Sequence, residues 1–394
     1  MKRCSRCIRP RSAFDTCLDA HGICNHCRDW ENIGPLLTDF SRWGKVFEKK
    51  LDRVRGKFEF DVMVGISGGK DGAYLAYMLK EKFGLRVLGL TIHYGFMPNE
   101  QAQQNAARVV EKLGLPHVHL RVPEPVVGKL FRSYMGGMLG FPLPCLMCTY
   151  ILGPALVAKA AIEHRVPLKI WGLDRGQLFA RLTETECRRA IYDQLVEFNP
   201  AAARIRQEAG LKKIGALLSK LGLNVQERHT IMPAGPTLKG TDLVPEQLRY
   251  YLFHSYDEAT IKQTIQEHAG WVPPAGDDMR GHFDCELKKA VSYTYPAMGI
   301  CSPLEWELSV DIREGKITRE AAMERVAAER RRALSCERPY EAYRLRFGLS
   351  ESAFERKIRS LRAIAPAWLQ AASQAGRFCR AMRPSPDPLA ALMK

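Results

Sequence analysis

An apolar segment that runs directly into a pair of glycines constrains the fold of this chain most strongly. Residues 58–66 (FEFDVMVGI) are typical of a buried strand, and a helix through about Lys82 is expected after the turn SGGKDG at residues 67–72. Two adjacent glycines let the backbone turn tightly and point several N–H groups at one spot, which the positive end of the helix reinforces as an anion site. The sequence therefore predicts a phosphate-binding loop, with a tight turn that binds no ligand as the alternative.

The pattern up to about residue 172 alternates strands with helices. Further strands are expected at residues 87–94, 117–122 and 168–172, and helices at residues 99–113 and 149–164. This alternation predicts an α/β fold, a parallel sheet with helices on both faces. Ligands of such sheets bind beyond the carboxyl ends of the strands, so the segments that begin at Ser67, His93 and Gly172 are expected to converge.

In this context the hexapeptide resembles the PP-loop signature of the adenine nucleotide alpha hydrolase-like superfamily; a Walker A loop has a longer spacing. The resemblance implies that ATP and Mg²⁺ bind, that a substrate oxygen attacks the α-phosphate and releases pyrophosphate, and that a nucleophile then displaces AMP. Gly72 departs from the signature, which usually has serine there. The residues implied in ATP binding are Ser67, Gly68, Gly69, Lys70, Asp71, Gly72, His93, Gly172 and Asp174, with Lys70 and Asp71 as catalytic candidates.

Two close cysteine pairs near the N-terminus predict a metal site. Cys4 and Cys7 form the first pair, and Cys24 and Cys27 form the second, with residues 8–23 between the pairs. Four thiolates at this spacing can surround one zinc ion tetrahedrally, and a site closed by four protein ligands stabilises a small module without catalysing a reaction. Cys17 is expected to take no part.

A third pair, Cys145 and Cys148, follows a proline at the expected start of a helix, where thiol pKa values are lowered. The pair resembles the cysteines of PP-loop tRNA thiolases, which hold an iron–sulfur cluster or transfer sulfur together with a third, downstream cysteine. That resemblance implies catalytic roles for both residues and a [4Fe-4S] cluster. Cys187, Cys285 and Cys301 are candidates for the third ligand if the fold brings one of them close. Buried inert cysteines or a second zinc site are the alternatives.

The ends of the chain resemble the N-acetyl sugar amidotransferases of bacterial surface-polysaccharide synthesis. The resemblance rests on the motif CSRCI…GICNHC and on residues 309–326 (SVDIREGKITREAAMERV). It implies that an acetamido group on an anionic sugar nucleotide or similar substrate becomes an acetamidino group, with ammonia from a glutaminase partner. The nucleophile stays open, because Lys70, Gly72 and the Cys145/Cys148 pair depart from this family.

Three functions are therefore considered. We expect first an ATP-dependent amidotransferase of this kind, and second a sulfur-inserting enzyme that acts on RNA or a small metabolite. The third is a zinc-dependent nucleic-acid-binding protein that binds nucleotide without turnover, which the intact loop disfavours. A net charge of +16 favours polyanionic partners such as RNA or nucleotides, although a solvated surface explains it equally well.

Three regions are expected along the chain: a zinc-binding module at residues 1–45, a PP-loop domain at residues 46–235 and a mainly helical region at residues 236–394. Thr318 is expected to cap a helix over REAAMERVAAERRRAL. Residues 133–158 carry no formal charge, but their prolines and glycines favour a buried active-site segment over a membrane helix. With no apolar core of a signal peptide at the N-terminus, the protein is expected to be cytoplasmic and without a membrane partner.

Overall fold

The computed structural model describes most of the chain. The described residues are 2–11, 16–93, 100–136, 147–180, 182–233, 243–274, 285, 288–298 and 301–338, with 341, 344, 345, 350, 352, 389 and 392. The predicted ligand Cys145 lies outside the described residues.

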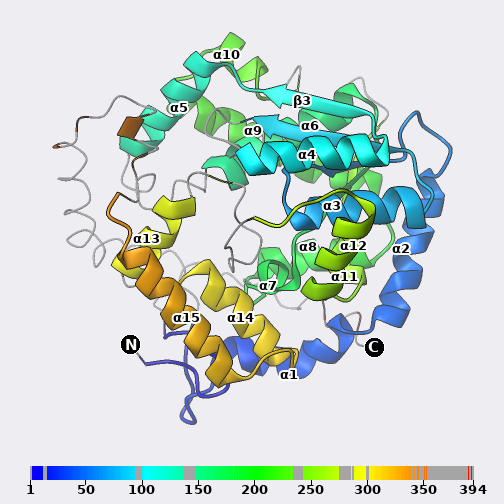
Figure 1. Cartoon of the computed structure of the whole chain (residues 1–394). Coiled ribbons are helices and arrows are strands. Elements are labelled where there is room, and N and C mark those ends of the chain that lie inside the picture. The colour runs from blue at the N-terminus through cyan, green and yellow to red at the C-terminus, as the bar shows by residue number, and fades with distance from the viewer. Residues whose placement is uncertain are drawn as a thin grey trace.

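A five-stranded parallel sheet forms the centre of the molecule (Figure 1). Its strands are β1 (Val62–Gly65), β2 (Val87–His93), β3 (His117–Arg121), β4 (Leu168–Trp171) and β5 (Glu246–Arg249), in the spatial order β3-β2-β1-β4-β5. Every neighbouring pair is parallel. The predicted α/β class and its first four strands are confirmed. The strand order reverses between β1 and β4, so the ligand crevice of such a sheet lies at their carboxyl ends.

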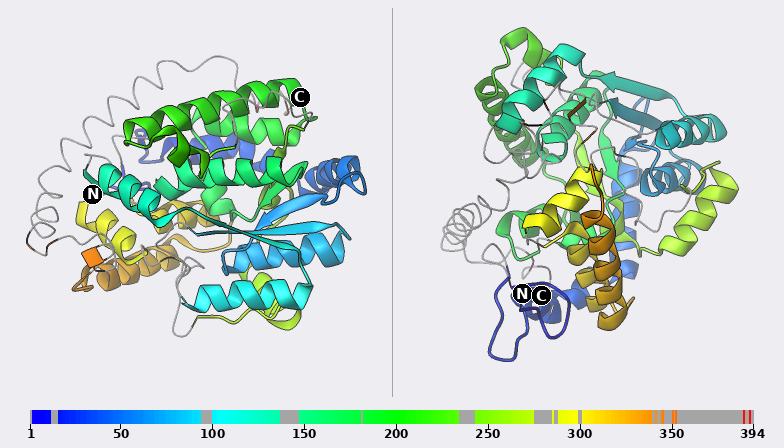
Figure 2. Two further views of the ribbon diagram at one scale, coloured as in Figure 1. Left: turned by 90° about the horizontal axis from the view of Figure 1, so that it is seen from above. Right: turned by 60° about the vertical axis from the view of Figure 1, so that its left-hand side comes forward.

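Helices cover both faces of the sheet, and Figure 2 shows them above and below the strands. Val62 and Val64 of β1 share an apolar core with α2 (Phe40–Val54), α3 (Lys70–Tyr77) and α4 (Glu100–Leu113). Met63, between the two valines, packs instead with α6 (Gly153–Glu163). Because consecutive side chains of a strand point to opposite faces, a continuous apolar strand can serve both layers.

The other helices complete the two layers and the C-terminal region. They are α1 (Asn25–Leu37), α5 (Glu124–Gly136), α7 (Arg175–Phe179), α8 (Thr185–Leu195), α9 (Pro200–Lys220), α10 (Val225–His229), α11 (Tyr250–Phe253), α12 (Glu258–His268), α13 (Lys288–Met298), α14 (Pro303–Arg313) and α15 (Arg319–Leu334). There are two π-helical turns: η1 (Met78–Lys82) directly follows α3, and η2 (Met147–Leu152) directly precedes α6. Among the described residues, no helix is long and apolar enough to cross a membrane.

Two local predictions about helices are confirmed. The helix after the glycine turn extends through η1 to Lys82. Thr318 caps α15, since its hydroxyl accepts a hydrogen bond of 3.2 Å from the Ala321 N–H. The helix expected from residue 149 begins two residues earlier, at Met147, as the π-helical turn η2.

The strand β5 was not expected from the sequence, because EQLR is short and polar. Its pairing with β4 buries Glu246, and Lys50 of α2 lies 2.8 Å from the Glu246 carboxylate in an ion pair that solvent hardly reaches. The neighbouring Arg53 also contacts this carboxylate. A buried carboxylate is tolerated only when cations compensate it, so tertiary contacts, not strand propensity, hold β5 in the sheet.

Arg175, at the start of α7, joins four distant parts of the chain. Its side chain is 1% exposed, and its Nε lies 2.6 Å from the carboxylate of Glu314, just after α14. Its two terminal nitrogens donate to the carbonyl oxygens of Tyr251, at 2.9 Å, and Leu37, at 3.1 Å. The ends of α1 and α14 and the helix α11 are therefore attached to the loop that follows β4.

The C-terminal helices α14 and α15 lie beside the N-terminal cysteine segment (Figure 1). Arg319 of α15 donates to the carbonyl oxygens of Cys7 and Cys4, at 3.2 and 3.4 Å. Ile8 packs with Leu308, Ala322 and Val326 of these helices in one apolar cluster. The N-terminal cysteine segment and the helices α14 and α15, which were expected to belong to separate regions, are in contact.

We predict that Arg175→Met lowers the free energy of unfolding by about 3–5 kcal/mol, because it leaves the buried Glu314 carboxylate with one cation fewer. Urea denaturation measures this change. The control is Arg206→Met, which removes a pair that is half exposed and 3.4 Å long, and should change stability by no more than about 0.5 kcal/mol. Equal effects of the two substitutions would contradict the role given to Arg175.

Candidate functional site

The turn at residues 67–72 lies at the carboxyl end of β1, next to the segment that follows β4. Gly69 caps α3 in an extended conformation, and its N–H donates to the Ser67 hydroxyl oxygen at 3.3 Å. The first N–H groups of α3 have no acceptor within the helix, so they are available to an anion at this end. The predicted strand–turn–helix geometry is therefore present.

Gly68 cannot be replaced without moving the backbone. Its φ is +88°, and a Cβ atom built on it would lie 2.0 Å from the carbonyl oxygen of Ala102 in α4. Its carbonyl oxygen accepts a hydrogen bond of 2.8 Å from the indole N–H of the buried Trp271. The left-handed conformation and this bond orient the peptide groups of the loop.

Two further glycines allow the loop to pack against the ends of the central strands. A Cβ atom at Gly72 would lie 2.4 Å from the carbonyl oxygen of Gly65, and one at Gly172 would lie 2.8 Å from that of Asp71. Gly72, the departure from the PP-loop signature, thus has no room for a side chain in this structure. Gly172 brings the segment after β4 into direct contact with Asp71, so these two predicted site residues are adjacent.

Lys70 and the carboxylates around it form the charged part of the site. Lys70 Nζ lies 3.0 Å from an Asp71 carboxylate oxygen, and the lysine side chain is only 1% exposed. Burial alone would lower the pKa of Lys70, but the charges of Asp71, Asp174 and Glu258 outweigh it and raise this pKa above its usual value. A lysine that stays charged beside two carboxylates can bind a polyphosphate together with a divalent cation.

Asp174 has a structural role as well as a charge. Its carboxylate accepts the N–H of Gln177 at 2.9 Å and caps α7, and the residue is 2% exposed. The next residue is Arg175, so the buried ion pair with Glu314 holds Asp174 in place near Lys70. The predicted residues Lys70, Asp71, Gly172 and Asp174 are therefore brought together.

Sequence analysis missed the residues that reinforce the loop from the region after β5. The indole N–H of Trp271 donates to the carbonyl oxygen of Gly68. Asn105 of α4 makes two hydrogen bonds with Val272: its amide donates to the Val272 carbonyl oxygen at 2.8 Å, and its side-chain oxygen accepts the Val272 N–H at 3.1 Å. Tyr256 places its ring 5.8 Å from Lys70 Nζ. No local motif marks these residues, because their partners lie far away in the sequence.

His93, one of the residues expected to bind ATP, lies at the end of β2. Its Nε2 is 3.0 Å from Nδ1 of His119 on β3. Burial lowers the pKa of His93, and the nearby charges of Arg121 and His119 lower it further, which favours the neutral form of the ring. The residues directly after it, 94–99, lie outside the described part of the chain. A role of His93 in binding adenosine stays a prediction.

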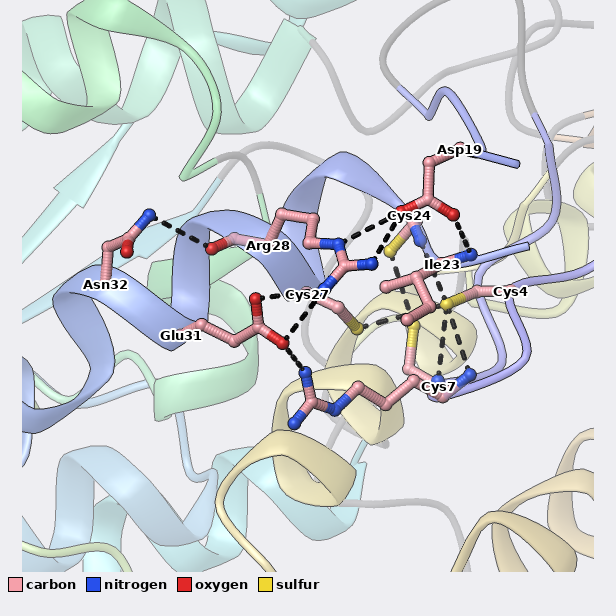
Figure 3. A network of polar contacts seen from close by, with 10 residues as sticks. Cys4, Cys7, Asp19, Ile23, Cys24, Cys27, Arg28, Glu31 and Asn32 are labelled. Atoms are coloured by element: carbon pink, nitrogen blue, oxygen red, sulfur yellow. Dashed lines mark hydrogen bonds and ion pairs between the residues drawn. The ribbon is translucent and has the colours of Figure 1, made fainter. Parts of the chain in front are cut away.

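The four N-terminal cysteines converge, as Figure 3 shows. The sulfur atoms of Cys4, Cys7, Cys24 and Cys27 all lie within 4.8 Å of one another and are buried. The backbone N–H groups of Arg6, Cys7 and Cys24 donate to Cys4 Sγ, at 3.4, 3.5 and 3.2 Å. Such N–H groups stabilise thiolates, so this predicted metal site is present as a donor set that suits tetrahedral zinc.

A cation from the C-terminal region faces the cysteine cluster. Hydrogen bonding to Cys24 and Cys27, together with a smaller effect of the charge of Arg313, lowers the pKa of Cys7 to about 6. None of the guanidinium nitrogens of Arg313 has a hydrogen-bond partner among the described residues, although they are buried. A negatively charged metal–thiolate group would compensate this cation, which fits a metal bound by the four cysteines.

Cys148 and one of the candidate third cysteines pack against the same apolar cluster. Cys148, in η2, and Cys285 are both half-buried and pack against the same apolar cluster, which includes Leu130 and Leu152. Cys187 packs in the core beside α7 instead, and the Cys301 thiol contacts the Ser302 carbonyl oxygen. Cys285 thus shares an apolar cluster with Cys148, while the position of Cys145 lies outside the described residues.

Comparisons with known proteins agree with the nucleotide loop. Residues 46–131 match the NAD synthase family, so this part of the chain is an NAD synthase-like PP-loop domain. A tRNA-specific 2-thiouridylase of Caldanaerobacter subterraneus is 32% identical over 205 residues, which are 43% of this chain and 53% of that protein. A second tRNA-specific 2-thiouridylase, of Fusobacterium nucleatum, is 36% identical over 91 residues, 22% of this chain and 26% of that protein.

Solved structures with similarity to this chain are more remote. The U34-tRNA thiolase NcsA of Methanococcus maripaludis, solved with its [4Fe-4S] cluster, covers 86% of this chain and 90% of its own at 14% identity, with a TM-score of 0.32. The NMN synthetase of Francisella tularensis covers 73% of this chain and 93% of its own at 16% identity, with a TM-score of 0.26. The chain thus spans about a quarter to a half of the curated relatives named above.

We predict that Gly68→Ala lowers the free energy of unfolding by about 1–3 kcal/mol, because alanine at this φ is strained and its Cβ atom clashes with the backbone of Ala102. Thermal unfolding measures the loss. Gly44→Ala is the control, because Gly44 lies inside α2 with nothing within 4 Å of a Cβ atom, and alanine there should raise stability by up to about 1 kcal/mol. A fully stable Gly68→Ala variant would contradict the described loop geometry.

We also predict that Cys7→Ser removes the metal bound at the N-terminus and lowers the melting temperature, since metal binding and folding of such a module are coupled. Metal analysis of the purified protein and thermal unfolding with and without a chelator measure both effects. Cys17→Ser is the matched control, because Cys17 is exposed and outside the four-cysteine set. A Cys7→Ser protein that retains one metal ion per chain would exclude the site.

Proposed function

We propose that this protein is an ATP-dependent sulfur-inserting enzyme, which activates a carbonyl oxygen of its substrate as an adenylate and replaces that oxygen with sulfur. The observation that carries the proposal is that a PP-loop domain similar to that of tRNA 2-thiouridylases occurs in one fold with Cys148 and Cys285 on a common apolar cluster. The first-ranked expectation from the sequence was an amidotransferase, and these findings favour its alternative.

The first half of the reaction belongs to the loop at residues 67–72. The pyrophosphate of ATP would bind at the N-terminus of α3 with Lys70, and Asp71 and Asp174 are the carboxylates available to hold Mg²⁺. The substrate oxygen attacks the α-phosphorus, the bond to the β-phosphate oxygen breaks, and pyrophosphate leaves. Positioning and charge neutralisation are the protein's main contributions to such a step.

The second half requires a sulfur nucleophile. Inorganic sulfide, or sulfur delivered as its equivalent, attacks the activated carbon, and AMP departs with the original oxygen, so one sulfur enters for each ATP that is split. We propose that Cys145, Cys148 and Cys285 hold an iron–sulfur cluster at this site. Three thiolate ligands leave one iron open, and a cluster of this kind could bind and supply the sulfur.

RNA is the substrate class that fits best. The net charge of +16 favours a polyanion, and the relatives named above are tRNA-modifying enzymes. The four N-terminal cysteines would hold a structural zinc ion, because a site closed by four protein thiolates has no position for a substrate. An amidotransferase that uses ammonia from a glutaminase is the alternative, in which Cys148 and Cys285 would be packing residues only.

The iron, sulfide and zinc content of anaerobically purified protein tests this proposal. We expect one zinc and about four irons with as many acid-labile sulfides per chain, together with a brown colour. Cys148→Ser and Cys285→Ser should each lose the iron and keep the zinc. Cys336→Ser is the matched control and should keep both metals, because Cys336 belongs neither to the four-cysteine set nor to the residues that pack against the apolar cluster at Cys148.

One zinc and no iron would contradict sulfur insertion and favour the amidotransferase. The adenylation step is tested separately with the variant Asp71→Ala. This substitution should abolish the release of pyrophosphate from ATP while the protein stays folded. Turnover by Asp71→Ala at the wild-type rate would refute the role of this carboxylate under either nucleophile.

A further inference from the structure

The turn between α14 and α15 brings one lysine to the nucleotide site from the C-terminal region. Gly315 adopts a φ of +71°, and the N–H of Lys316 donates to the carbonyl oxygen of Asp311 at 2.9 Å. This turn ends the helix and directs the Lys316 side chain toward Tyr256. The lysine belongs to the segment EGKITRE, whose role the sequence analysis left unassigned.

Tyr256 connects Lys316 with the phosphate loop. Lys70 Nζ lies 5.8 Å from the centroid of the Tyr256 ring, and Lys316 Nζ lies 5.7 Å from the same centroid. The tyrosine is 5% exposed, and its hydroxyl has no hydrogen-bond partner among the described residues. Burial raises the pKa of Tyr256, and the charges of Asp71 and Asp174 raise it further, so this ring lies close to both carboxylates of the site.

The ion pairs around Lys316 leave a surplus positive charge. The Glu314 carboxylate contacts Arg175 Nε through one oxygen, at 2.6 Å, and Lys316 Nζ through the other, at 2.8 Å. Two cations thus share one carboxylate. Arg175 and Glu314 are almost completely buried, whereas the Lys316 side chain is 35% exposed, so the lysine is the member of this trio that an incoming anion can reach.

We propose that Lys316 is a second phosphate-binding lysine, which contacts the polyphosphate of ATP beside Lys70 and stabilises the negative charge that develops on pyrophosphate as it leaves. This inference rests on the proposed use of ATP and applies to either nucleophile. Glu314 keeps the lysine extended in the absence of ATP, and the buried Arg175 keeps Glu314 in place. A preorganised cation of this kind acts without rearrangement when the charge develops.

A purely structural role of Lys316 makes a different prediction. If the lysine only neutralised Glu314, its loss would weaken folding and would affect all nucleotides alike. Arg175 already pairs with Glu314 at a shorter distance and in a more buried position, so Glu314 does not depend on Lys316 for compensation. A phosphate-binding role predicts a loss of affinity that grows with the number of phosphates on the nucleotide. A structural role predicts the same loss for every nucleotide.

The experiment compares the binding of ATP and of AMP to the full-length protein by isothermal titration calorimetry in the presence of Mg²⁺. We expect Lys316→Met to weaken ATP binding about tenfold and AMP binding by less than about twofold, because charge-assisted bonds to the outer phosphates are lost. Lys316→Arg should retain most of the affinity for ATP. Lys316→Met should also slow the release of pyrophosphate more than Lys316→Arg does.

The matched control is Lys129→Met. Lys129 pairs with Glu227 at 2.9 Å, and its side chain is 40% exposed, but it lies on α5, away from the loop. ATP binding by Lys316→Met that equals the wild type, or an equal loss for ATP and AMP, would overturn this inference and leave the proposed function intact. A wild-type protein that binds no ATP would overturn both.

Discussion

The arrangement of the site depends on the contacts that the buried guanidinium of Arg175 makes. Removing a charge from water is costly, and this one is compensated by Glu314 and by the carbonyl oxygens of Leu37 and Tyr251. Movement of any one of these segments would remove a partner of this buried charge. Since Arg175 directly follows Asp174, the segment after β4 is held beside the phosphate loop by contacts with α1, α11 and the end of α14.

The same region connects the cysteine site to the nucleotide site. Arg313 faces the four sulfurs, the next residue, Glu314, pairs with Arg175, and Arg319 binds the carbonyl oxygens of Cys4 and Cys7. One turn of chain between α14 and α15 therefore contacts both sites. The four-cysteine module at the N-terminus thus contributes to the position of the helices α14 and α15 and, through them, to one side of the candidate nucleotide site.

Much of the candidate site was predictable because its signals are local. The strand, the glycine turn and the helix are consecutive, so the turn geometry follows from residues 58–82, and the close spacing within each cysteine pair brings the four sulfurs within reach of one ion. Gly72 stands where the signature usually has serine, and the structure shows that the carbonyl oxygen of Gly65 leaves no room for a side chain there. The strand β5 was missed, because its stability comes from Lys50 and Arg53 on α2 and not from its own residues.

The sequence by itself determined the α/β class, the strand–glycine turn–helix geometry and the convergence of the four cysteines, because each depends on backbone conformation or residue spacing within a short segment. Only the tertiary structure decided which distant residues gather around these segments: Trp271 on Gly68, Cys285 on the apolar cluster that Cys148 contacts, and Lys70 and Lys316 at the ring of Tyr256. The physical reason is that such contacts are made when the helices pack on the sheet. Burial and charge compensation select them, and neither leaves a periodic or spaced pattern in the sequence.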